Sequence, residues 1–318
     1  MRYRIIVSLV LATLLFSCKK DDDNNLIEVP PSLLGDVAPE DDATIREFLN
    51  THFYNYEDFQ NEPNVSHEII IDTIAGANAD KTPMSEFAES IVINVSSSFL
   101  GLEAEEIDIP HTLYFIDVKQ GTGDKSPTVA DSVLVRYQGS LLDGTLFDES
   151  KDFIWQELAF SAVRGFPNGI AQLKSGTADQ IVDNPDGTYE ITNSGQGIII
   201  IPSGLAYFNR PPTSAIPLYA NMLFKVEVGL FMEDTDNDND GIPSIMEDLN
   251  GNGYLFDDNT DVDSEPTFAI LANFRDADDD GDGVSTRKEI TDDNGDIIFP
   301  YPDSDGDGVP DYLDPDTN

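Results

Sequence analysis

The sequence predicts an α+β fold for residues 111–233, in which an antiparallel sheet curls around one short helix. Apolar segments recur there at short spacing, as strands do. An Asp-Gly pair, Asp143-Gly144, indicates a tight turn. The segment 166–173, with Gly176 after it, indicates a short helix. Many strands with a single helix are typical of an antiparallel sheet covered on one face.

The first 18 residues have the pattern of a secretory signal. Arg2 and Arg4 precede an apolar run, residues 5–16, that is shorter than the roughly 20 apolar residues of a bilayer-spanning helix. Cys18 is the only cysteine, which excludes an intrachain disulfide. Leu15-Phe16-Ser17-Cys18 resembles a bacterial lipobox, whose cysteine is acylated. The alternative is an ordinary signal peptide with an incidental cysteine.

Residues 19–40 are expected to form a tether. Their start, Lys19-Lys20-Asp21-Asp22-Asp23, resembles the charged export tag of Bacteroidetes lipoproteins. That resemblance implies an exported protein held by lipid in the outer membrane, on its periplasmic face or at the cell surface. Pro30, Pro31 and Pro39 favour an extended linker.

Residues 41–110 are expected to form an N-terminal extension. Thr44-Ile-Arg-Glu47 fits a capping box that starts a helix, with Ile45, Phe48 and Leu49 on one face. Segments 68–74 and 90–96 are expected to be strands. The pattern indicates no chemistry here. The extension either packs against the middle domain or forms a small domain of its own.

The middle domain, 111–233, contains the clearest strands, at 113–119, 132–137, 197–201 and 222–230. Val133, Val135 and Tyr137 alternate with other residues and therefore share one face. Residues 177–196 contain the turn Asn184-Pro-Asp-Gly187 and are expected to add a hairpin. This hairpin either extends a binding surface or only decorates an edge.

Five motifs follow one another through the middle domain. They are Val135-Arg-Tyr137-Gln-Gly139-Ser-Leu-Leu-Asp143-Gly144-Thr-Leu-Phe147-Asp148, Ala162-Val163-Arg-Gly165-Phe166, Gly169-Ile-Ala-Gln-Leu173, Ile201-Pro202-Ser203-Gly-Leu-Ala206-Tyr207, and Ala215-Ile216-Pro217 with Leu223-Phe224-Lys-Val-Glu227-Val228. In this order they resemble the FKBP family of peptidyl-prolyl cis-trans isomerases. The resemblance implies a half-barrel sheet wrapped on a short helix, and catalysis of Xaa-Pro isomerisation without a cofactor.

The resemblance also implies a largely apolar pocket. Its implied wall residues are Tyr137, Phe147, Trp155, Val163, Phe166, Tyr207 and Phe224. Asp148 would orient the peptide at the pocket edge, and Tyr207 would donate a hydrogen bond to a peptide carbonyl. The alternative is that these aromatic residues are plain core of a half-buried sheet. The chain departs from the family at Phe166, usually tryptophan, at Phe208, often glycine, and at Leu218, often proline.

The tail, residues 234–318, is strongly acidic. From residue 233 onward there are 27 Asp or Glu residues against three basic ones, within a chain of net charge −44. Such a charge excludes nucleic acid as a partner, because a phosphate backbone would repel it. It also opposes docking on an anionic lipid surface, so that a membrane would be reached only through the acyl anchor.

The register of acidic residues in the tail predicts calcium loops. Calcium loops place oxygen ligands at alternating positions, a glycine at six and a carboxylate at twelve. Three segments fit this pattern, and a weaker copy begins at residue 248. The implied ligands of the three segments are Asp236, Asp238, Asp240 and Glu247; Asp278, Asp280, Asp282 and Glu289; and Asp303, Asp305, Asp307, Asp311 and Asp314. Those of the weaker copy are Asp248, Asn250 and Asn252. The spacing resembles thrombospondin type 3 repeats. The alternative is a solvated, disordered acidic tail without metal.

Three functions are consistent with the sequence. The first is an anchored prolyl isomerase that acts on proline-containing chains during the folding of exported proteins. The second is a non-catalytic FKBP-like module that binds peptides or a partner protein. The third is a surface protein whose calcium-bound tail acts as a spacer or adhesive arm.

Overall fold

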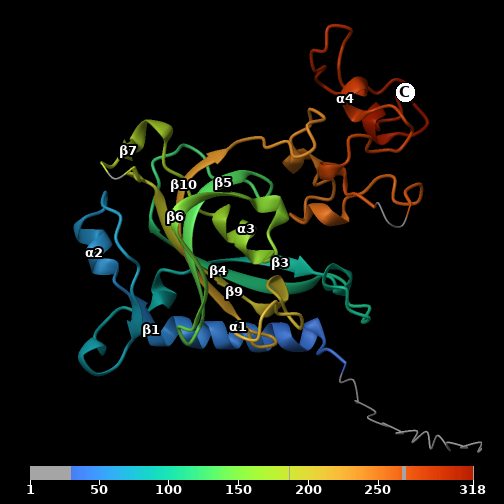
Figure 1. Cartoon of the computed structure of the whole chain (residues 1–318). Coiled ribbons are helices and arrows are strands. Elements are labelled where there is room, and N and C mark those ends of the chain that lie inside the picture. Colours follow the sequence, from blue (N-terminus) through green and yellow to red (C-terminus); the bar gives the residue numbers. More distant parts are fainter. Residues whose placement is uncertain (1–29, 186, 267–269, 318) are drawn as a thin grey trace, which may run out of the picture. The chain divides into compact units, whose positions relative to one another are not determined.

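A computed structural model describes residues 30–185, 187–266 and 270–317. Its main feature is a six-stranded antiparallel sheet, which confirms the predicted α+β class. The sheet is strongly curved, with a short helix in its hollow (Figure 1). In spatial order the strands are β3 Glu89–Val95, β4 Ile109–Lys119, β9 Gly195–Ile201, β10 Met222–Met232, β5 Ser132–Leu141 and β6 Leu146–Glu157.

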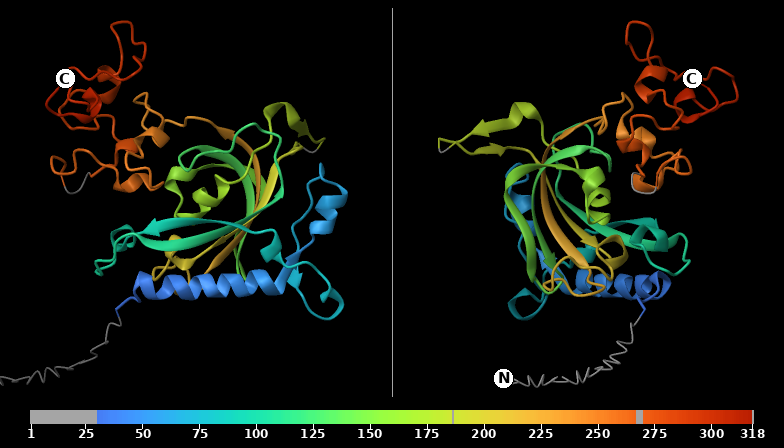
Figure 2. Two further views of the ribbon diagram at one scale, coloured as in Figure 1. Left: turned by 180° about the vertical axis from the view of Figure 1, so that it is seen from behind. Right: turned by 45° about the vertical axis from the view of Figure 1, so that its right-hand side comes forward.

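Two helices cover opposite faces of this sheet, as the views in Figures 1 and 2 agree. Helix α3, Gly165–Ile170, lies in the hollow, and helix α1, Leu34–Thr51, lies across the outer face. The remaining elements are smaller: α2 Tyr56–Asn61, α4 Thr286–Glu289, the pair β1 His52–Tyr54 with β2 Ile71–Thr73, and the hairpin β7 Ile181–Asp183 with β8 Tyr189–Ile191. The hairpin confirms the prediction for the insertion.

Strand β9 is buried along its whole length because it lies between the two helices. Its isoleucines alternate: Ile199 and Ile201 belong to the core under α3, whereas Ile198 and Ile200 belong to the core under α1. Helix α3 approaches this strand very closely. A Cβ atom on Gly169 would lie 2.3 Å from Cγ2 of Ile199, so that only glycine fits. The result is two apolar cores that share one strand.

Helix α1 begins ten residues before the predicted capping box, which corrects both that prediction and the end of the tether. Its N-terminus is capped from outside the helix: the Glu106 carboxylate accepts hydrogen bonds from the backbone N–H groups of Leu34 (2.7 Å) and Gly35 (2.8 Å). Thr44 lies inside the helix, where its hydroxyl donates to a carbonyl one turn back. Pro39 is part of the helix rather than of a linker.

The N-terminal extension and the middle domain share the sheet. Strand β3 pairs with β4, and β4 pairs with the central β9.

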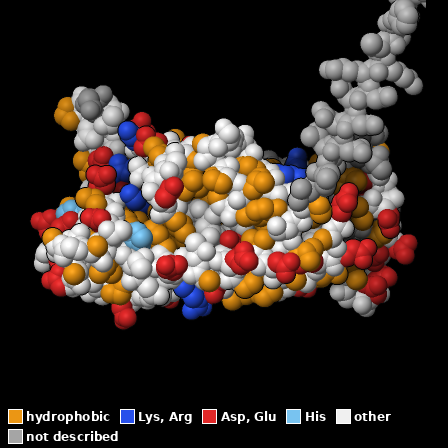
Figure 3. All heavy atoms as spheres, turned by 90° about the horizontal axis from the view of Figure 1, so that it is seen from below, with side chains coloured by type: hydrophobic (Ala, Val, Ile, Leu, Met, Phe, Trp, Pro, Cys, Tyr) orange, Lys and Arg blue, Asp and Glu red, His pale blue; other side chains and the backbone are white. Residues whose placement is uncertain are grey.

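The signal segment, Cys18 and the charged residues 19–23 lie outside the described residues. Among the residues that are described, no helix has the length and apolar composition required to cross a bilayer. Seen from the side of α1, the visible surface carries many Asp and Glu side chains and few Lys or Arg (Figure 3).

The tail from residue 234 is irregular but contains small apolar cores. Ile242, Ile290 and Tyr312, one from each predicted calcium loop region, pack together. A second core brings Leu255 and Phe274 of the tail against Ala130 of the middle domain. The tail therefore packs on itself and on the neighbouring domain.

Asp41 links α1 to the loop that follows β9. Its Oδ2 atom accepts hydrogen bonds from both the backbone N–H (2.9 Å) and the hydroxyl (2.7 Å) of Ser203, which is completely buried. Burial raises the pKa of Asp41 to about 6. The carboxylate is thus kept in the interior by the two donors of Ser203.

We expect Asp41→Ala to lower the free energy of unfolding by about 2–3 kcal/mol, because the two Ser203 donors lose their buried acceptor. Chemical denaturation of the full chain measures this. Glu40→Ala is the matched control, since it removes an exposed acid from the adjacent position of the same helix. Equal effects of the two substitutions would contradict this role for Asp41.

Candidate functional site

A cavity of about 730 Å³ opens in the hollow of the sheet, beside α3. Its walls come from β5, β6, α3, β10 and the loop after β9. The structure brings all eight sequence-predicted pocket residues to this cavity: Tyr137, Phe147, Asp148, Trp155, Val163, Phe166, Tyr207 and Phe224. They come from positions up to 87 residues apart in the chain, so that their meeting is a consequence of the fold.

The floor of the cavity is formed by packed aromatic rings. Phe166 and Phe224 are each only 4% exposed, and their ring centroids lie 5.0 Å apart at 64°. Tyr137 meets the edge of Phe166 at 5.8 Å, and Phe147 meets Phe224 at 5.6 Å. Edge-to-face pairs of this kind add about 0.5–1.5 kcal/mol each beyond area burial. The floor is therefore rigid and apolar.

Gly139 makes room for two of these rings. In the sheet register it lies opposite Asp148 on β6 and Phe224 on β10. A Cβ atom added to it would lie 2.7 Å from Cε2 of Phe147 and 2.9 Å from Cε1 of Phe224. The two rings therefore explain why the first motif has glycine at this position: a side chain there would overlap them.

The polar edge of the cavity is formed by two tyrosines and one carboxylate. The Tyr137 hydroxyl donates a hydrogen bond to Oδ2 of the exposed Asp148 (2.7 Å). Burial, and secondarily this bond, raise the pKa of Tyr137 to about 12. Burial and then the Asp148 charge also raise the pKa of Tyr207. The Tyr207 hydroxyl has no hydrogen-bond partner among the described residues, so its proton is available to a ligand at neutral pH.

The rim of the cavity is more exposed than its floor. Trp155, the only tryptophan of the chain, is 51% exposed at the mouth. The cavity also contains Ile216 and Phe160, which we did not predict as site residues. Ile216 lies in one of the five motifs, which offered a signal. Phe160 lies in a stretch without a motif, so that only the fold reveals it.

Phe208 occupies a backbone conformation that explains the family's preference for glycine there. Its φ angle is +50°, in the left-handed region that glycine adopts most easily. The side chain is buried and packs edge-on against Tyr219 at 4.8 Å. The loop thus keeps a backbone conformation suited to glycine, and aromatic packing offsets the strain.

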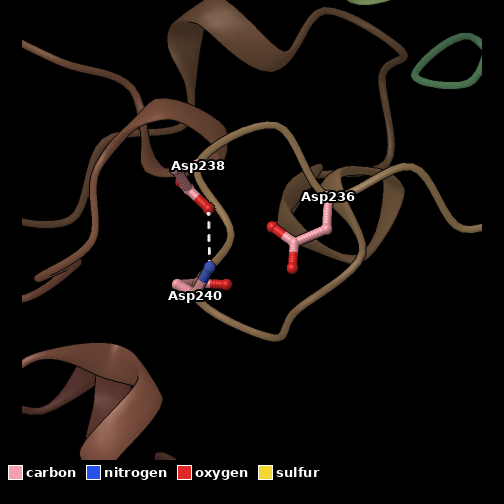
Figure 4. A group of neighbouring side chains, drawn as sticks. All are labelled: Asp236, Asp238 and Asp240. Carbon is pink, nitrogen blue, oxygen red and sulfur yellow. Dashed lines mark hydrogen bonds between the residues drawn. The ribbon is translucent and has the colours of Figure 1, made fainter.

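The tail brings the predicted calcium ligands together in groups. Asp236, Asp238 and Asp240 form one group, and their equivalents in the next two loops form two more: Asp278, Asp280 and Asp282, then Asp303, Asp305 and Asp307. Within the first, the side chain of Asp236 points toward the inside of the loop, and the Asp240 N–H donates to Asp238 (Figure 4).

The acids at the twelfth position differ between loops. Glu247 and Glu289 have no hydrogen-bond donor at either carboxylate oxygen. Burial and then neighbouring acids raise the pKa of Glu247 to about 10 and that of Glu289 to about 8, which favours a proton or a cation at each. Asp314 belongs to none of the acidic groups found among the described residues, and Asp311 already accepts two hydrogen bonds from Ser304.

The weaker copy is organised differently. Asp248 accepts hydrogen bonds from the backbone of Asn252 and Gly253. The side-chain amides of Asn250 and Asn252 donate to Asp258 and Asp257. Only the oxygens that these contacts leave free remain for a cation.

Comparison with known proteins gives matches in two parts of the chain. Residues 123–229 match the family model described as FKBP-type peptidyl-prolyl cis-trans isomerase, and residues 237–302 match the model described as BamM C-terminal. FK506-binding protein 1 of Dictyostelium discoideum is 30% identical over 118 residues, which cover 36% of this chain and 92% of that protein. Peptidyl-prolyl cis-trans isomerase Fkbp12 of Drosophila melanogaster is 31% identical over 98 residues, covering 30% and 89%.

Longer relatives match only in part. Peptidyl-prolyl cis-trans isomerase FKBP4 of Bos taurus is 30% identical over 128 residues, 39% of this chain but only 24% of that protein. Among solved structures, FkpA from Escherichia coli has a TM-score of 0.32 and 20% identity, and the match covers 62% of this chain and 61% of that one.

We expect Gly139→Ala to lower the free energy of unfolding by about 1–3 kcal/mol, because the new methyl group forces the Phe147 and Phe224 rings apart. Ser140→Ala is the control on the neighbouring residue, whose side chain points to the other face of the sheet. Chemical denaturation of both variants measures the difference. If Gly139→Ala is as stable as the wild-type chain, the tight packing described for the floor is wrong.

Proposed function

Because the chain belongs to the FKBP-type peptidyl-prolyl cis-trans isomerase family, we propose that its cavity binds Xaa-Pro segments and accelerates their cis–trans isomerisation during the folding of exported proteins. The observation that carries this proposal is the meeting of the eight predicted pocket residues, seven of them from the ordered motifs, around one cavity. Plain core aromatics would be packed without such a space between them.

The chemistry required of the site is modest. Rotation about a peptide bond faces a barrier of about 18–20 kcal/mol because the planar amide is stabilised by resonance. The twisted transition state loses this resonance and much of its polarity. An apolar pocket therefore disfavours the planar ground state more than the twisted state, which is differential binding. Packed rings such as Phe166 and Phe224 supply that environment.

The polar edge would hold the peptide in register. The free Tyr207 hydroxyl is suited to donate to a peptide carbonyl, since its raised pKa keeps it protonated. Asp148 fixes the Tyr137 ring through their hydrogen bond and leaves a second oxygen for a peptide N–H. Trp155, exposed at the mouth, would cover the bound proline. Of these roles, those of Asp148 as the polar orienter and of Tyr207 as the donor follow the family resemblance.

The setting of the protein is also a proposal. The lipobox-like Cys18 and the charged export tag support an exported chain that is anchored by lipid in the outer membrane. The grouped carboxylates of the tail support calcium binding there. Calcium at millimolar concentration outside the cytoplasm suits loops with dissociation constants of roughly 10⁻⁴–10⁻³ M. In the alternative of a surface arm, this tail would be the working part.

We expect the full chain to accelerate isomerisation of an Xaa-Pro peptide in a coupled assay, and Phe147→Ala and Asp148→Ala to lower kcat/KM by tenfold or more. Phe299→Ala is the matched control, because it removes an aromatic ring that is 76% exposed in the tail. It should leave kcat/KM unchanged. No acceleration by the wild-type chain would refute catalysis.

The same samples distinguish catalysis from binding alone. Because Trp155 is the sole tryptophan and lies at the mouth of the cavity, its emission reports on peptide binding at this site. A peptide-induced change in emission without any acceleration would select the non-catalytic module. The expected result is that emission and catalysis saturate over the same peptide concentrations.

We expect calcium to stabilise the tail. At a concentration 100 times the dissociation constant, one site adds about 2.7 kcal/mol to the stability of the bound state. Thermal unfolding followed by circular dichroism, in calcium and after chelation, measures this. Magnesium at equal concentration is the control, because general screening of the acidic chain acts equally with both ions. An identical response to the two ions would argue against calcium loops.

A further inference from the structure

A third acidic residue joins the end of the first calcium loop. Asp240 and Glu247 of loop 236–247 meet Asp279 of loop 278–289, and one carboxylate oxygen from each lies within 4.8 Å of the others. Asp279 was not among the predicted ligands. In the second loop it occupies position two, between the ligand positions of Asp278 and Asp280, so that its own loop gives it no place in a calcium site.

The three side chains are buried to an unusual degree for acids. Asp240, Glu247 and Asp279 are each only 1% exposed. Within the described part of the chain, no donor reaches either oxygen of Glu247, either oxygen of Asp279, or Oδ2 of Asp240. Five carboxylate oxygens are therefore buried and unpaired in one place.

Among the described residues, the nearby Arg287 charge compensates this cluster only in part: burial raises the pKa of Asp240, and the Arg287 charge lowers it. None of the ion pairs among the described residues involves any of the three acids. Burying a polar group without a partner costs several kcal/mol, and burying a charge without one costs more. Either protonation of these acids or a bound cation would relieve this cost, and a cation would engage all three side chains at once.

The spacing of the oxygens suits calcium. Calcium binds six to eight oxygens at about 2.3–2.6 Å, so that two ligands on opposite sides of one ion lie about 4.6–5.2 Å apart. The three carboxylate oxygens lie within 4.8 Å of one another, so that a single ion could contact all three. Asp240 also belongs to the group with Asp236 and Asp238, which connects Asp279 to the ligand set of the first loop.

We propose that Asp279 is a calcium ligand supplied by the second loop to the first, so that one ion ties loop 236–247 to loop 278–289. The inference rests on the proposed calcium binding of the tail. Such an ion closes the intervening segment 248–277 at its base. Phe274 of this segment contacts Phe160 at the cavity rim, and Arg275 stacks over the same ring.

The test is a calcium titration of the full chain by calorimetry. We expect Asp279→Asn to weaken one site at least tenfold and to reduce the rise in melting temperature that calcium produces. Asp293→Asn is the matched control, because Asp293 is exposed and belongs to no acidic group among the described residues. It should bind calcium as the wild-type chain does.

A second variant protects the test against misfolding. Glu247→Gln acts from the other loop, and the double variant should lose less than the sum of the two single losses, because both residues act on one ion. If Asp279→Asn binds calcium like the wild-type chain, or if the losses add fully, the shared site is refuted. If the wild-type chain binds no calcium, the proposal for the tail fails as a whole, whatever the variants do.

Discussion

The burial of strand β9 between two helices is the constraint on which the rest of the structure depends. Its alternating isoleucines must be covered on both faces, so helix α3 occupies the hollow and helix α1 the outer face. Helix α3 packs so closely on β9 that position 169 must be glycine, and the same packing brings Phe166 to the cavity floor. The outer helix is in turn held by Glu106 and Ser203, which come from distant parts of the chain. The cavity is thus positioned by a core that the extension completes.

The two halves of the chain use opposite physical means. The middle domain builds its site from apolar rings, and the proposed reaction needs few polar groups because it involves a loss of polarity. The tail gathers carboxylates that repel one another and that bury oxygens without donors. Small apolar cores such as Ile242, Ile290 and Tyr312 hold the loops together, but they leave those oxygens unpaired. Cations would therefore complete the tail, whereas the middle domain is complete without them.

The cavity residues could be named from the sequence because all of them except Trp155 lie in ordered motifs. Prediction from the sequence failed where an element depends on a residue far away in the chain, or where the local pattern of apolar residues is weak. The start of α1 depends on Glu106, some 70 residues away, which no capping rule within the helix reveals. Strand β6 was missed because it is an edge strand with exposed side chains and lacks a clear alternation. Asp279 was missed because loop patterns assign ligands only within one loop.

The central claim is that this cavity turns over Xaa-Pro bonds, and magnetisation-exchange NMR on a proline peptide tests it most directly. Free peptides exchange between cis and trans over tens to hundreds of seconds, too slowly to give exchange cross-peaks. With a catalytic amount of the full chain, cross-peaks between the cis and trans signals should appear, and a peptide without proline should show none. Peptide signals that broaden on binding while cis and trans remain unconnected would contradict catalysis by this site.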